Sequence, residues 1–399
     1  MLLNTLMSLR EEFVKFALAD GSNISELCHR FNISRKTGYK WIERFLTEGF
    51  SGFADRSRKP MTSPNKTSEI MEEAVLSIRE QHPAWGGRKI RKRLQTLGWT
   101  GVPTASTITA ILQRRGCINP AESFKHKPWQ RFEADLPNDL WQMDFKGHFD
   151  AAQGRCHPLT VLDDHSRYAL GLRACNNETA TTVRQNLIQV FKRYGLPKSL
   201  LVDNGSPWGS DEQHRHTPLT AWLIRQGIVV IHSRPYHPQT LGKDERFHRS
   251  LKAEVAQYCL GLSLDDCQRR FDTWRDVYNL QRPHESLDMQ VPGDCYLPSP
   301  RRFQEKLPPI EYSPEDKERK GQKGGWISYQ GKEDRIAKAF YGERVALRHT
   351  AIDGRLDVFF CNRRITEIDL KNHNSTQKSV TYVPEQLLPI SPVYTTGED

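Results

Sequence analysis

The feature that most constrains the fold is a change of pattern at Asp139. Before this residue the chain is patterned as helices, whereas after it short apolar and β-branched runs alternate with helical segments up to about residue 290. Such an alternation is typical of an α/β domain, in which helices cover the faces of a sheet. Residues 136–290 are therefore predicted to form one α/β domain.

The order of these elements is more specific than the alternation itself. Three strands come first, then a helix, a strand, a helix, a strand and further helices, which is the order of a ribonuclease-H-like domain. The expected strands cover residues 140–147, 158–163, 168–174, 199–202 and 229–232. The expected helices cover residues 179–194, 219–226, 242–257 and 264–279.

Positive charge is concentrated in the first third of the chain. Lys and Arg outnumber Asp and Glu by nine in residues 1–130, and the whole chain has a net charge of +10. A basic part beside a neutral one indicates that the first part binds a polyanion. A solvated basic face without a partner is the alternative, and charge alone does not decide between them.

Residues 1–50 predict three helices with helix-turn-helix spacing. The third, over residues 35–46 and capped by Ser34, is of the kind that enters a DNA major groove. Gly38 inside it costs about 1 kcal/mol of helix stability relative to Ala. The first turns of this helix offer side chains suited to phosphates and base edges, namely Arg35, Lys36, Thr37 and Lys40.

Residues 67–117 repeat the theme after a basic linker rich in Ser and Pro. Helices over residues 68–81, 87–97 and 105–115 predict a second helix-turn-helix unit. Two units joined in this way would span a longer DNA site than either alone. The candidate DNA contacts of this unit are Arg88, Lys89, Arg91 and Lys92.

The C-terminal part returns to short strands after a charged, proline-rich connector. Runs at residues 326–329, 336–339, 343–348, 357–361 and 364–369 predict a small all-β barrel over residues 325–372. The chain is thus expected to be multidomain, with all-α units, a central α/β domain and an all-β domain in that order.

Cysteine spacing and hydropathy indicate in which compartment the chain works and whether it contacts a membrane. The eight cysteines include no Cys-x-x-Cys pair, so a structural zinc site is not predicted and reduced cysteines in a cytoplasmic protein are the interpretation. No apolar run approaches the length of a membrane span, so no membrane partner is expected.

Two carboxylates stand where an α/β sheet places its site. Asp144 lies in a largely apolar strand, where an unpaired charge is very unfavourable and calls for a salt bridge or a metal ion. Asp203 directly follows the apolar run 200–202, at the carboxyl end of a strand. If the two strands are parallel neighbours, the carboxylates face each other, and a divalent cation would relieve their repulsion. Taken alone, either residue could instead cap a turn or a helix.

A third carboxylate comes from the helix expected at residue 242. Helical spacing places Asp244 in line with Leu251, whereas Glu245 shares a face with His248 and Arg249. Spacing alone does not decide which of the two acids is functional. Asp163 and Asp164 are rival carboxylates, but they fall at a hairpin and are expected to serve the turn.

Together these segments resemble the catalytic core of retroviral-integrase-type (DDE) transposases of bacterial insertion sequences. The similarity covers roughly residues 8–290, and the family's glutamate precedes the Arg-Phe-His run, which selects Glu245 over Asp244. Forty-one residues separate Asp203 from Glu245, somewhat more than is usual, and residues 209–216 can hold the surplus as a loop. The matching text is Trp141-Gln142-Met143-Asp144, Val202-Asp203-Asn204-Gly205, Arg234-Pro235-Tyr236-His237-Pro238-Gln239-Thr240, Gly242-Lys243-Asp244-Glu245-Arg246, Tyr278-Asn279 and Arg282-Pro283-His284.

The resemblance implies a polynucleotidyl transferase that cuts and joins phosphodiester bonds. Two Mg²⁺ ions, for which Mn²⁺ can substitute, would be held by Asp144, Asp203 and Glu245, and no covalent protein–DNA intermediate is needed. In similar enzymes the loop before the catalytic helix contacts DNA. The DNA contacts expected in that loop and helix are Tyr236, His237, Gln239, Lys243, Arg246 and Arg249.

The predicted function is that of a transposase, which binds the terminal inverted repeats of its element and transfers the cut strands into target DNA. It would work on the bacterial nucleoid in the cytoplasm, as at least a dimer, because two DNA ends must be joined. Two alternatives stay open. One is a metal-dependent nuclease of the same fold, and the other is a DNA-binding repressor whose α/β domain is inert.

Overall fold

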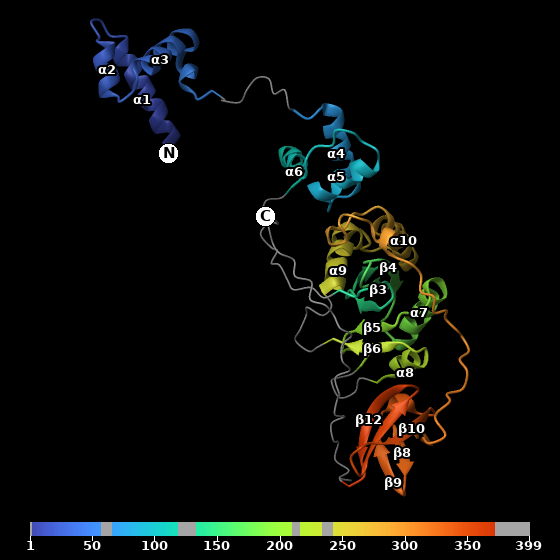
Figure 1. Cartoon of the computed structure of the whole chain (residues 1–399). Helices are drawn as coiled ribbons and strands as arrows, with labels where there is room; N and C mark the ends of the chain where they lie inside the picture. Colours follow the sequence, from blue (N-terminus) through green and yellow to red (C-terminus); the bar gives the residue numbers. More distant parts are fainter. Residues whose placement is uncertain (1, 57–65, 119–132, 210–215, 234–241, 372–399) are drawn as a thin grey trace. The chain divides into compact units, whose positions relative to one another are not determined.

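The computed structural model describes residues 2–56, 66–118, 133–209, 216–233 and 242–371. The chain divides into two compact units, Met1–Lys66 and Thr67–Asp399, and Figure 1 traces both. No helix within the described ranges is long and apolar enough to cross a membrane. All eight cysteines lie in these ranges, and none is bonded to another.

The first unit is a bundle of three helices followed by a short 3-10 turn. Its elements are α1 (Leu2–Ala17), α2 (Ile24–Arg30), α3 (Arg35–Glu48) and η1 (Gly49–Phe53). The helix α3 begins where the sequence predicts, because the Ser34 hydroxyl accepts a hydrogen bond from the backbone N–H of Thr37. Phe13, Cys28 and Trp41 bring the three helices into one core.

Close packing of the three helices explains why Gly38 stands in the middle of α3. A Cβ atom there would lie 2.6 Å from Cys28 Sγ of α2 and 2.8 Å from Phe13 Cζ of α1. Both separations are far inside van der Waals contact, so the helices approach this closely only because residue 38 has no side chain. The loss of helix propensity expected from the sequence is therefore offset by packing.

Three further helices open the second unit. They are α4 (Glu69–Gln81), α5 (Gly87–Thr96) and α6 (Ala105–Arg114), and their core contains Val75, Trp85, Ile90 and Ile111. Glu72 is almost fully buried beside this core. Its carboxylate forms ion pairs with Arg114 at 3.2 Å and Arg115 at 3.3 Å, which neutralise the buried charge.

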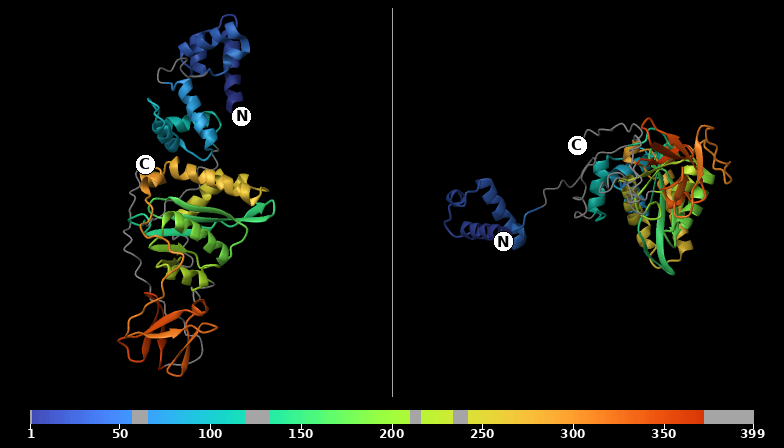
Figure 2. Two further views of the ribbon diagram at one scale, coloured as in Figure 1. Left: turned by 90° about the vertical axis from the view of Figure 1, so that its right-hand side faces the viewer. Right: turned by 90° about the horizontal axis from the view of Figure 1, so that it is seen from below.

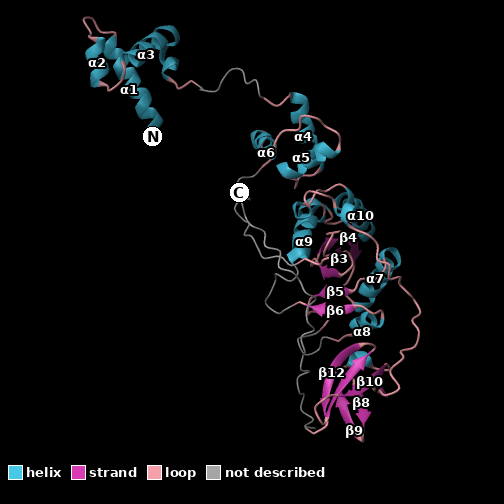
Figure 3. Ribbon diagram, in the orientation of Figure 1, coloured by secondary structure: helices cyan, strands magenta, loops and turns pink. Residues whose placement is uncertain are grey.

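The α/β part is built on a six-stranded sheet of order β2-β3-β1-β5-β6, in which β4 also pairs with β3. β1 is antiparallel to β3 and parallel to β5, and β6 is parallel to β5. This is the ribonuclease-H-like fold that the sequence predicts, and Figure 3 shows its strands against the helices. The strands are β1 (Leu140–Phe145), β2 (Phe149–Ala151), β3 (Gly154–Asp163), β4 (Ala169–Cys175), β5 (Ser199–Val202) and β6 (Val229–His232).

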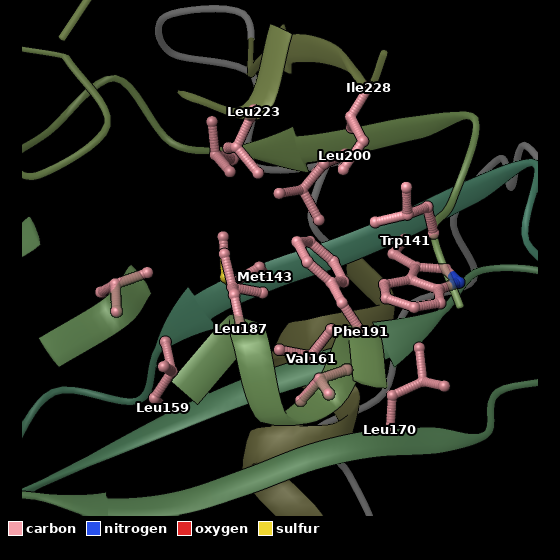
Figure 4. Close-up of a cluster of buried hydrophobic side chains, with 14 of the residues drawn as sticks. Trp141, Met143, Leu159, Val161, Leu170, Leu187, Phe191, Leu200, Leu223 and Ile228 are labelled. Carbon is pink, nitrogen blue, oxygen red and sulfur yellow. The ribbon is translucent and has the colours of Figure 1, made fainter. Parts of the chain in front are cut away.

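Helices cover both faces of this sheet (Figures 1 and 2). On one face, Trp141 and Met143 of β1 pack with side chains of α7 (Ala180–Tyr194) and α8 (Pro218–Arg225), as Figure 4 shows for Leu187, Phe191 and Leu223. The other face carries α9 (Gly242–Glu254), η4 (Ala256–Tyr258) and α10 (Leu264–Leu280), with a separate core. Because side chains alternate along a strand, Gln142 and Asp144 lie on the α9 face.

The segment after α10 runs back along the α/β part. It contains η5 (Glu285–Leu287) and α11 (Pro292–Cys295), and Tyr296 joins the core under α7. Farther on, the backbone N–H of Leu196 donates to the carbonyl of Arg301 at 2.8 Å. The Arg301 guanidinium in turn donates to the carbonyl of Gly227 at 2.8 Å, so this segment is hydrogen-bonded to the loops that precede β5 and β6.

The C-terminal part is all-β, with two antiparallel sheets of order β12-β11-β10-β7 and β8-β9. Its core is shared with α8: Ala221 and Ile224 pack among its buried residues, while Leu219 and Leu223 of the same helix face the α/β core. The elements are β7 (Lys317–Lys320), β8 (Trp326–Tyr329), β9 (Lys332–Arg335), η6 (Lys338–Phe340), β10 (Arg344–His349), β11 (Arg355–Phe360) and β12 (Arg363–Asp369).

Two strands of this part differ from the sequence prediction. The strand β7 lies before residue 325, in the segment that was expected to be a connector. Residues 336–339 were expected to be a strand, but the strand is the charged segment β9, and η6 follows it. Tyr329 pairs with Lys332 across a tight turn in the β8–β9 hairpin, and Gly331 in that turn has a φ of +75°. The short turn fixes the register, so the polar residues take the strand positions whatever their hydrophobicity.

We expect Gly38→Ala to destabilise the first unit, although Ala is the better helix former. The new methyl group would overlap Cys28 Sγ and Phe13, and overpacking of this kind costs about 1–3 kcal/mol. The measurement is chemical denaturation of the full chain followed by circular dichroism. Glu43→Ala, an exposed change on the same helix, is the control, and a more stable Gly38→Ala variant would contradict the packing argument.

Candidate functional site

Asp144 and Asp203 end two neighbouring parallel strands at the same edge of the sheet. Gln142 of β1 is in register with Leu201 of β5, and each aspartate lies two residues farther along its strand. Neighbouring strands are about 4.8 Å apart, so the two carboxylates project side by side from the carboxyl ends of the strands. This is the edge at which α/β sheets place their sites.

Local hydrogen bonds hold the turn that carries Asp203. Its carboxylate accepts the backbone N–H of Gly205 at 3.1 Å, and its carbonyl lies 3.0 Å from Nδ1 of His232 on β6. The amide of Asn204 donates to the carbonyl of Ser233 at 2.8 Å. The Asp-Asn-Gly turn after β5 is therefore attached to β6 by hydrogen bonds. Only one carboxylate oxygen of Asp203 accepts the Gly205 N–H, so the other can bind another partner.

The electrostatics of the site come from burial and from like charges. Burial, then the charge of Asp203, then those of Glu178 and Glu245 raise the pKa of Asp144 to about 7. Burial also raises the pKa of Asp203, with Glu178 adding to it. Each carboxylate is thus destabilised by its neighbours, a situation that a bound cation would relieve.

The helix α9 presents Asp244 and Glu245 very differently. Glu245 is exposed to solvent, whereas Asp244 is fully buried in line with Leu251. Neither oxygen of Asp244 has a hydrogen-bond partner among the described residues. Burial, with smaller contributions from Asp144 and Asp164, raises the pKa of Asp244 well above its usual range, which disfavours the charged form of this side chain. This favours Glu245 as the charged acid of α9.

The donor set fits a hard divalent cation in its chemistry, because Mg²⁺ takes carboxylate oxygens as ligands. Within the described ranges, however, no group of three or more His, Cys, Asp and Glu side chains is arranged to hold a metal ion. Asp144 and Asp203 lie side by side, and the charges of Asp203 and Glu245 both act on Asp144. The assignment of all three as metal ligands stays a prediction.

Glu178 is a fourth acid at this edge, which the sequence analysis did not single out. It follows the end of β4, and β4 runs in the same direction as β1 because both are antiparallel to β3. Its carboxylate lies 2.7 Å from Nδ1 of His157. An acid just after a strand whose carboxyl end reaches the site edge was the signal that could have identified it.

The rival acids Asp163 and Asp164 have different roles. Asp163 serves the turn, since it accepts hydrogen bonds from Ser166 N at 2.8 Å and Ser166 Oγ at 2.6 Å. Asp164 does more than the turn role expected from the sequence. It is fully buried, and its carboxylate is bonded to Gln142 of β1 and paired with Lys243 of α9.

The predicted DNA contacts of the first unit lie at the start of α3. Arg35, Lys36 and Lys40 are exposed there, and Thr37 is half-buried. The ammonium group of Lys40 lies 4.9 Å from the centre of the Trp41 ring. The arrangement leaves Arg35 and Lys36 accessible, so their assignment as DNA contacts stays a prediction.

The predicted contacts on α5 point in more than one direction. Arg91 is exposed and Lys92 half-buried, whereas Arg88 forms a 3.6 Å ion pair with Glu285 of η5. Burial and the charge of Arg282 lower the pKa of Lys89 to about 8. Arg88 thus contacts the segment that follows α10, although its side chain is still 65% exposed. The assignment of all four residues as DNA contacts stays a prediction.

The remaining predicted contacts belong to α9 and the loop before it. Arg246 and Arg249 are exposed on α9, but the Lys243 side chain is only 11% exposed. Its ammonium group forms an ion pair with Asp164 instead of reaching solvent. Tyr236, His237 and Gln239 lie outside the described residues.

Five family models match parts of the chain. A model described as an integrase core domain matches residues 134–238, and a second model with that description matches residues 226–292. A model of the C-terminal domain of IS481 family transposases matches residues 316–376. A helix-turn-helix domain matches residues 9–61, and a homeodomain-like domain matches residues 37–112.

Individual proteins of insertion elements are also similar to this chain, each over 40% of its length. An uncharacterized 39.2 kDa protein of insertion element IS476 from Xanthomonas euvesicatoria is 29% identical over 160 residues, which is 40% of this chain and 44% of that protein. An uncharacterized 31.7 kDa protein of insertion element IS407 from Burkholderia multivorans is 24% identical over 40% of this chain and 55% of that protein. The chain thus matches about half the length of these curated relatives.

Among solved structures, the catalytic core domain of HTLV-2 integrase in complex with magnesium is similar to 41% of this chain and 99% of that domain. The sequence identity is 18% and the TM-score is 0.33.

We expect Glu245→Gln to weaken Mn²⁺ binding by at least about 10-fold, because it removes a charged ligand. Asp244→Asn should leave Mn²⁺ affinity within about 2-fold, since Asn resembles a neutral, buried Asp in size and charge. The measurement is titration of the full chain with Mn²⁺, with the free ion followed by electron paramagnetic resonance. A large loss in Asp244→Asn, with none in Glu245→Gln, would reverse the assignment of the two acids.

Proposed function

Because the chain belongs to the retroviral-integrase-type (DDE) transposases of bacterial insertion sequences, we propose that it moves such an element. It binds the terminal inverted repeats of the element, cleaves the DNA at their ends in a metal-dependent reaction, and transfers the cut strands into target DNA. Its catalytic residues are Asp144, Asp203 and Glu245.

One observation supports this proposal most directly. Asp144 and Asp203 each lie two residues beyond the registered pair Gln142–Leu201 of the adjacent parallel strands β1 and β5. The charges of Asp203 and of Glu245, which is 101 residues farther along the chain, both act on Asp144. A fold that only needed to be stable would gain nothing from converging acids, since their repulsion is unfavourable. Convergence of this kind is typical of functional sites.

The three carboxylates would hold two Mg²⁺ ions, or Mn²⁺ in their place, which when bound supply activation of a water or 3′-hydroxyl oxygen and stabilisation of the leaving oxygen. The chain itself provides the charges around them. Lys146 lies two residues after Asp144, and its pKa is lowered by burial and by the nearby Lys252. Two neighbouring cations of this kind suit a DNA phosphate.

His248 has a supporting role in this scheme. Its Nε2 lies 2.8 Å from the Thr160 hydroxyl, and burial together with Lys146 lowers its pKa to about 3. It is therefore neutral at physiological pH and serves as a hydrogen-bonding group. A proton carrier would need a pKa nearer to 7.

Recognition of the element ends belongs to the helical units. The basic N-terminal third and the accessible start of α3 suit the phosphates and base edges of DNA. Two successive units would read a longer site than one. Since two DNA ends must be joined, the chain acts as at least a dimer when assembled on DNA.

The decisive experiment uses labelled duplexes copied from the DNA that flanks the chain's own coding sequence. With Mg²⁺ and a target plasmid, the native chain should cleave the duplexes and join them to the plasmid, whereas Asp203→Asn should lower both products by more than about 100-fold. Chelation of the metal should have the same effect. Gel electrophoresis of the labelled strands measures cleavage and joining separately.

The alternatives predict different products in the same assay. Cleavage without joining would indicate a nuclease of the same fold. Specific binding of the duplexes with no product, or equal product from the native chain and Asp203→Asn, would indicate a repressor whose α/β domain is inert and would overturn the catalytic assignment.

We also expect Lys36→Ala to weaken binding of the flanking duplexes. The loss of one phosphate contact should reduce the slope of log affinity against log salt by about 1. Fluorescence anisotropy at several salt concentrations measures this slope. Lys15→Ala, which removes an equally exposed charge on α1 that is paired with Glu11, is the matched control. An unchanged slope in Lys36→Ala would remove α3 from the DNA interface.

A further inference from the structure

We propose that Lys243 is a positioning residue, which through its buried ion pair with Asp164 fixes the first turn of α9, and with it Glu245, against β1. The inference rests on the proposed function, because it assigns a role in the same site. It replaces the sequence prediction that Lys243 contacts DNA.

Both partners of the ion pair are shielded from solvent. The Lys243 ammonium group contacts the Asp164 carboxylate and donates to the Asp164 carbonyl at 3.1 Å. The Lys243 side chain is 11% exposed and that of Asp164 is 0% exposed. A phosphate would have to displace a fully buried carboxylate to reach this ammonium group, so the geometry favours an internal role.

Asp164 is itself built into the strand that carries Asp144. Its carboxylate accepts a hydrogen bond from Gln142 Nε2 at 2.6 Å and one from the backbone N–H of Ala134 at 2.8 Å. Its own N–H donates to the carbonyl of Leu140 at 2.9 Å. Asp164 therefore cannot shift without disturbing β1.

Each end of this connection lies two residues before one of the acids of the proposed site. Gln142 lies two residues before Asp144 and shares its face of the strand, because side chains alternate. Lys243 lies two residues before Glu245 in the first turn of α9. The path Gln142–Asp164–Lys243 thus joins the two elements immediately before the residues that must meet.

A second connection lies on the other side of Glu245. The Thr160 hydroxyl donates to the Asp144 carbonyl at 2.9 Å, so the ring N–H of His248 is the donor in its 2.8 Å contact with that hydroxyl. His248 is one turn after Glu245 on α9. Glu245 is therefore held between two attachments of α9 to the strands, and the Lys243 pair is the charged one.

The charge balance of the pair decides which variants are informative. Removing one partner leaves a buried charge unpaired and destabilises the fold strongly, whereas replacing both partners by neutral residues is far less disruptive. Lys243→Met and Asp164→Asn alone could lose function simply by unfolding. The double variant Lys243→Met/Asp164→Asn removes the connection without leaving an unpaired charge. It therefore tests the effect on the position of Glu245 apart from the effect on the stability of the fold.

The experiment measures three properties of the full-length native chain and these variants. Thermal unfolding reports stability, electron paramagnetic resonance reports Mn²⁺ affinity, and anisotropy without divalent ions reports affinity for the flanking duplexes. We expect the double variant to recover the melting temperature relative to Lys243→Met, but to bind Mn²⁺ about 10–100-fold more weakly than the native chain. DNA affinity and its salt dependence should not change.

Lys192→Met is the matched control, since it breaks an exposed ion pair with Glu305 in the same unit and should change none of the three properties. Two results would overturn the proposal. If the double variant recovers Mn²⁺ affinity together with stability, the pair is only structural. If Lys243→Met lowers DNA affinity and the salt slope by about 1 while Mn²⁺ affinity holds, Lys243 is a DNA contact.

Failure of the proposed function would look different. A native chain that binds Mn²⁺ but neither cleaves nor joins the flanking duplexes would overturn the transposase assignment, while the Mn²⁺ titrations of the variants would still decide the role of Lys243. A native chain that binds no Mn²⁺ would overturn both.

Discussion

Repulsion between carboxylates is the constraint on which the site depends. Two parallel strands end in aspartates in register, and burial raises the pKa of both. Such an arrangement is unfavourable in the isolated chain, so the surrounding fold must supply the stability that keeps it. The hydrophobic core on the α7 face of the sheet includes side chains of both strands and holds β1 and β5 together. The acids are therefore imposed on the sheet edge by packing that is independent of their charge.

The attachment of α9 follows from the same constraint. A helix that carries an acid toward two others is repelled from them, unless other contacts oppose the repulsion. The described contacts of its first two turns include an ion pair with Asp164 and a hydrogen bond to Thr160, and the next turn adds apolar packing through Leu251. Asp244 is different, because its burial raises its pKa and disfavours its charged form. The residues that attach α9 to the strands are thus different from the acids that it carries.

Much of this could be predicted from the sequence, and the limits have physical causes. Strand order, the neighbouring ends of β1 and β5 and the burial of Asp244 follow from periodicity, which reports which face of an element is covered. The role of Asp164 could not be found in this way, since it depends on Gln142 and Lys243, which local pattern does not reveal as partners. Glu178 could have been found from its place just after β4, but its effect on Asp144 could not. Arg88 and Lys89 show a related limit: a basic run on a helix suggests DNA, and local pattern does not reveal that Arg88 pairs with Glu285 or that the charge of Arg282 acts on Lys89. The exact domain boundaries and the DNA contacts stay predictions.

The double use of α8 has a consequence for how such chains can be rearranged. One side of this short helix completes the core of the α/β part, and the other completes the core of the all-β part. The helix α8 ends 92 residues before β7 begins, yet it shares a hydrophobic core with the all-β part. A gene fusion that exchanged the C-terminal part alone would leave Ala221 and Ile224 facing a foreign surface. Successful exchanges should therefore carry matched changes at α8, and variation at these positions should follow the C-terminal part through evolution.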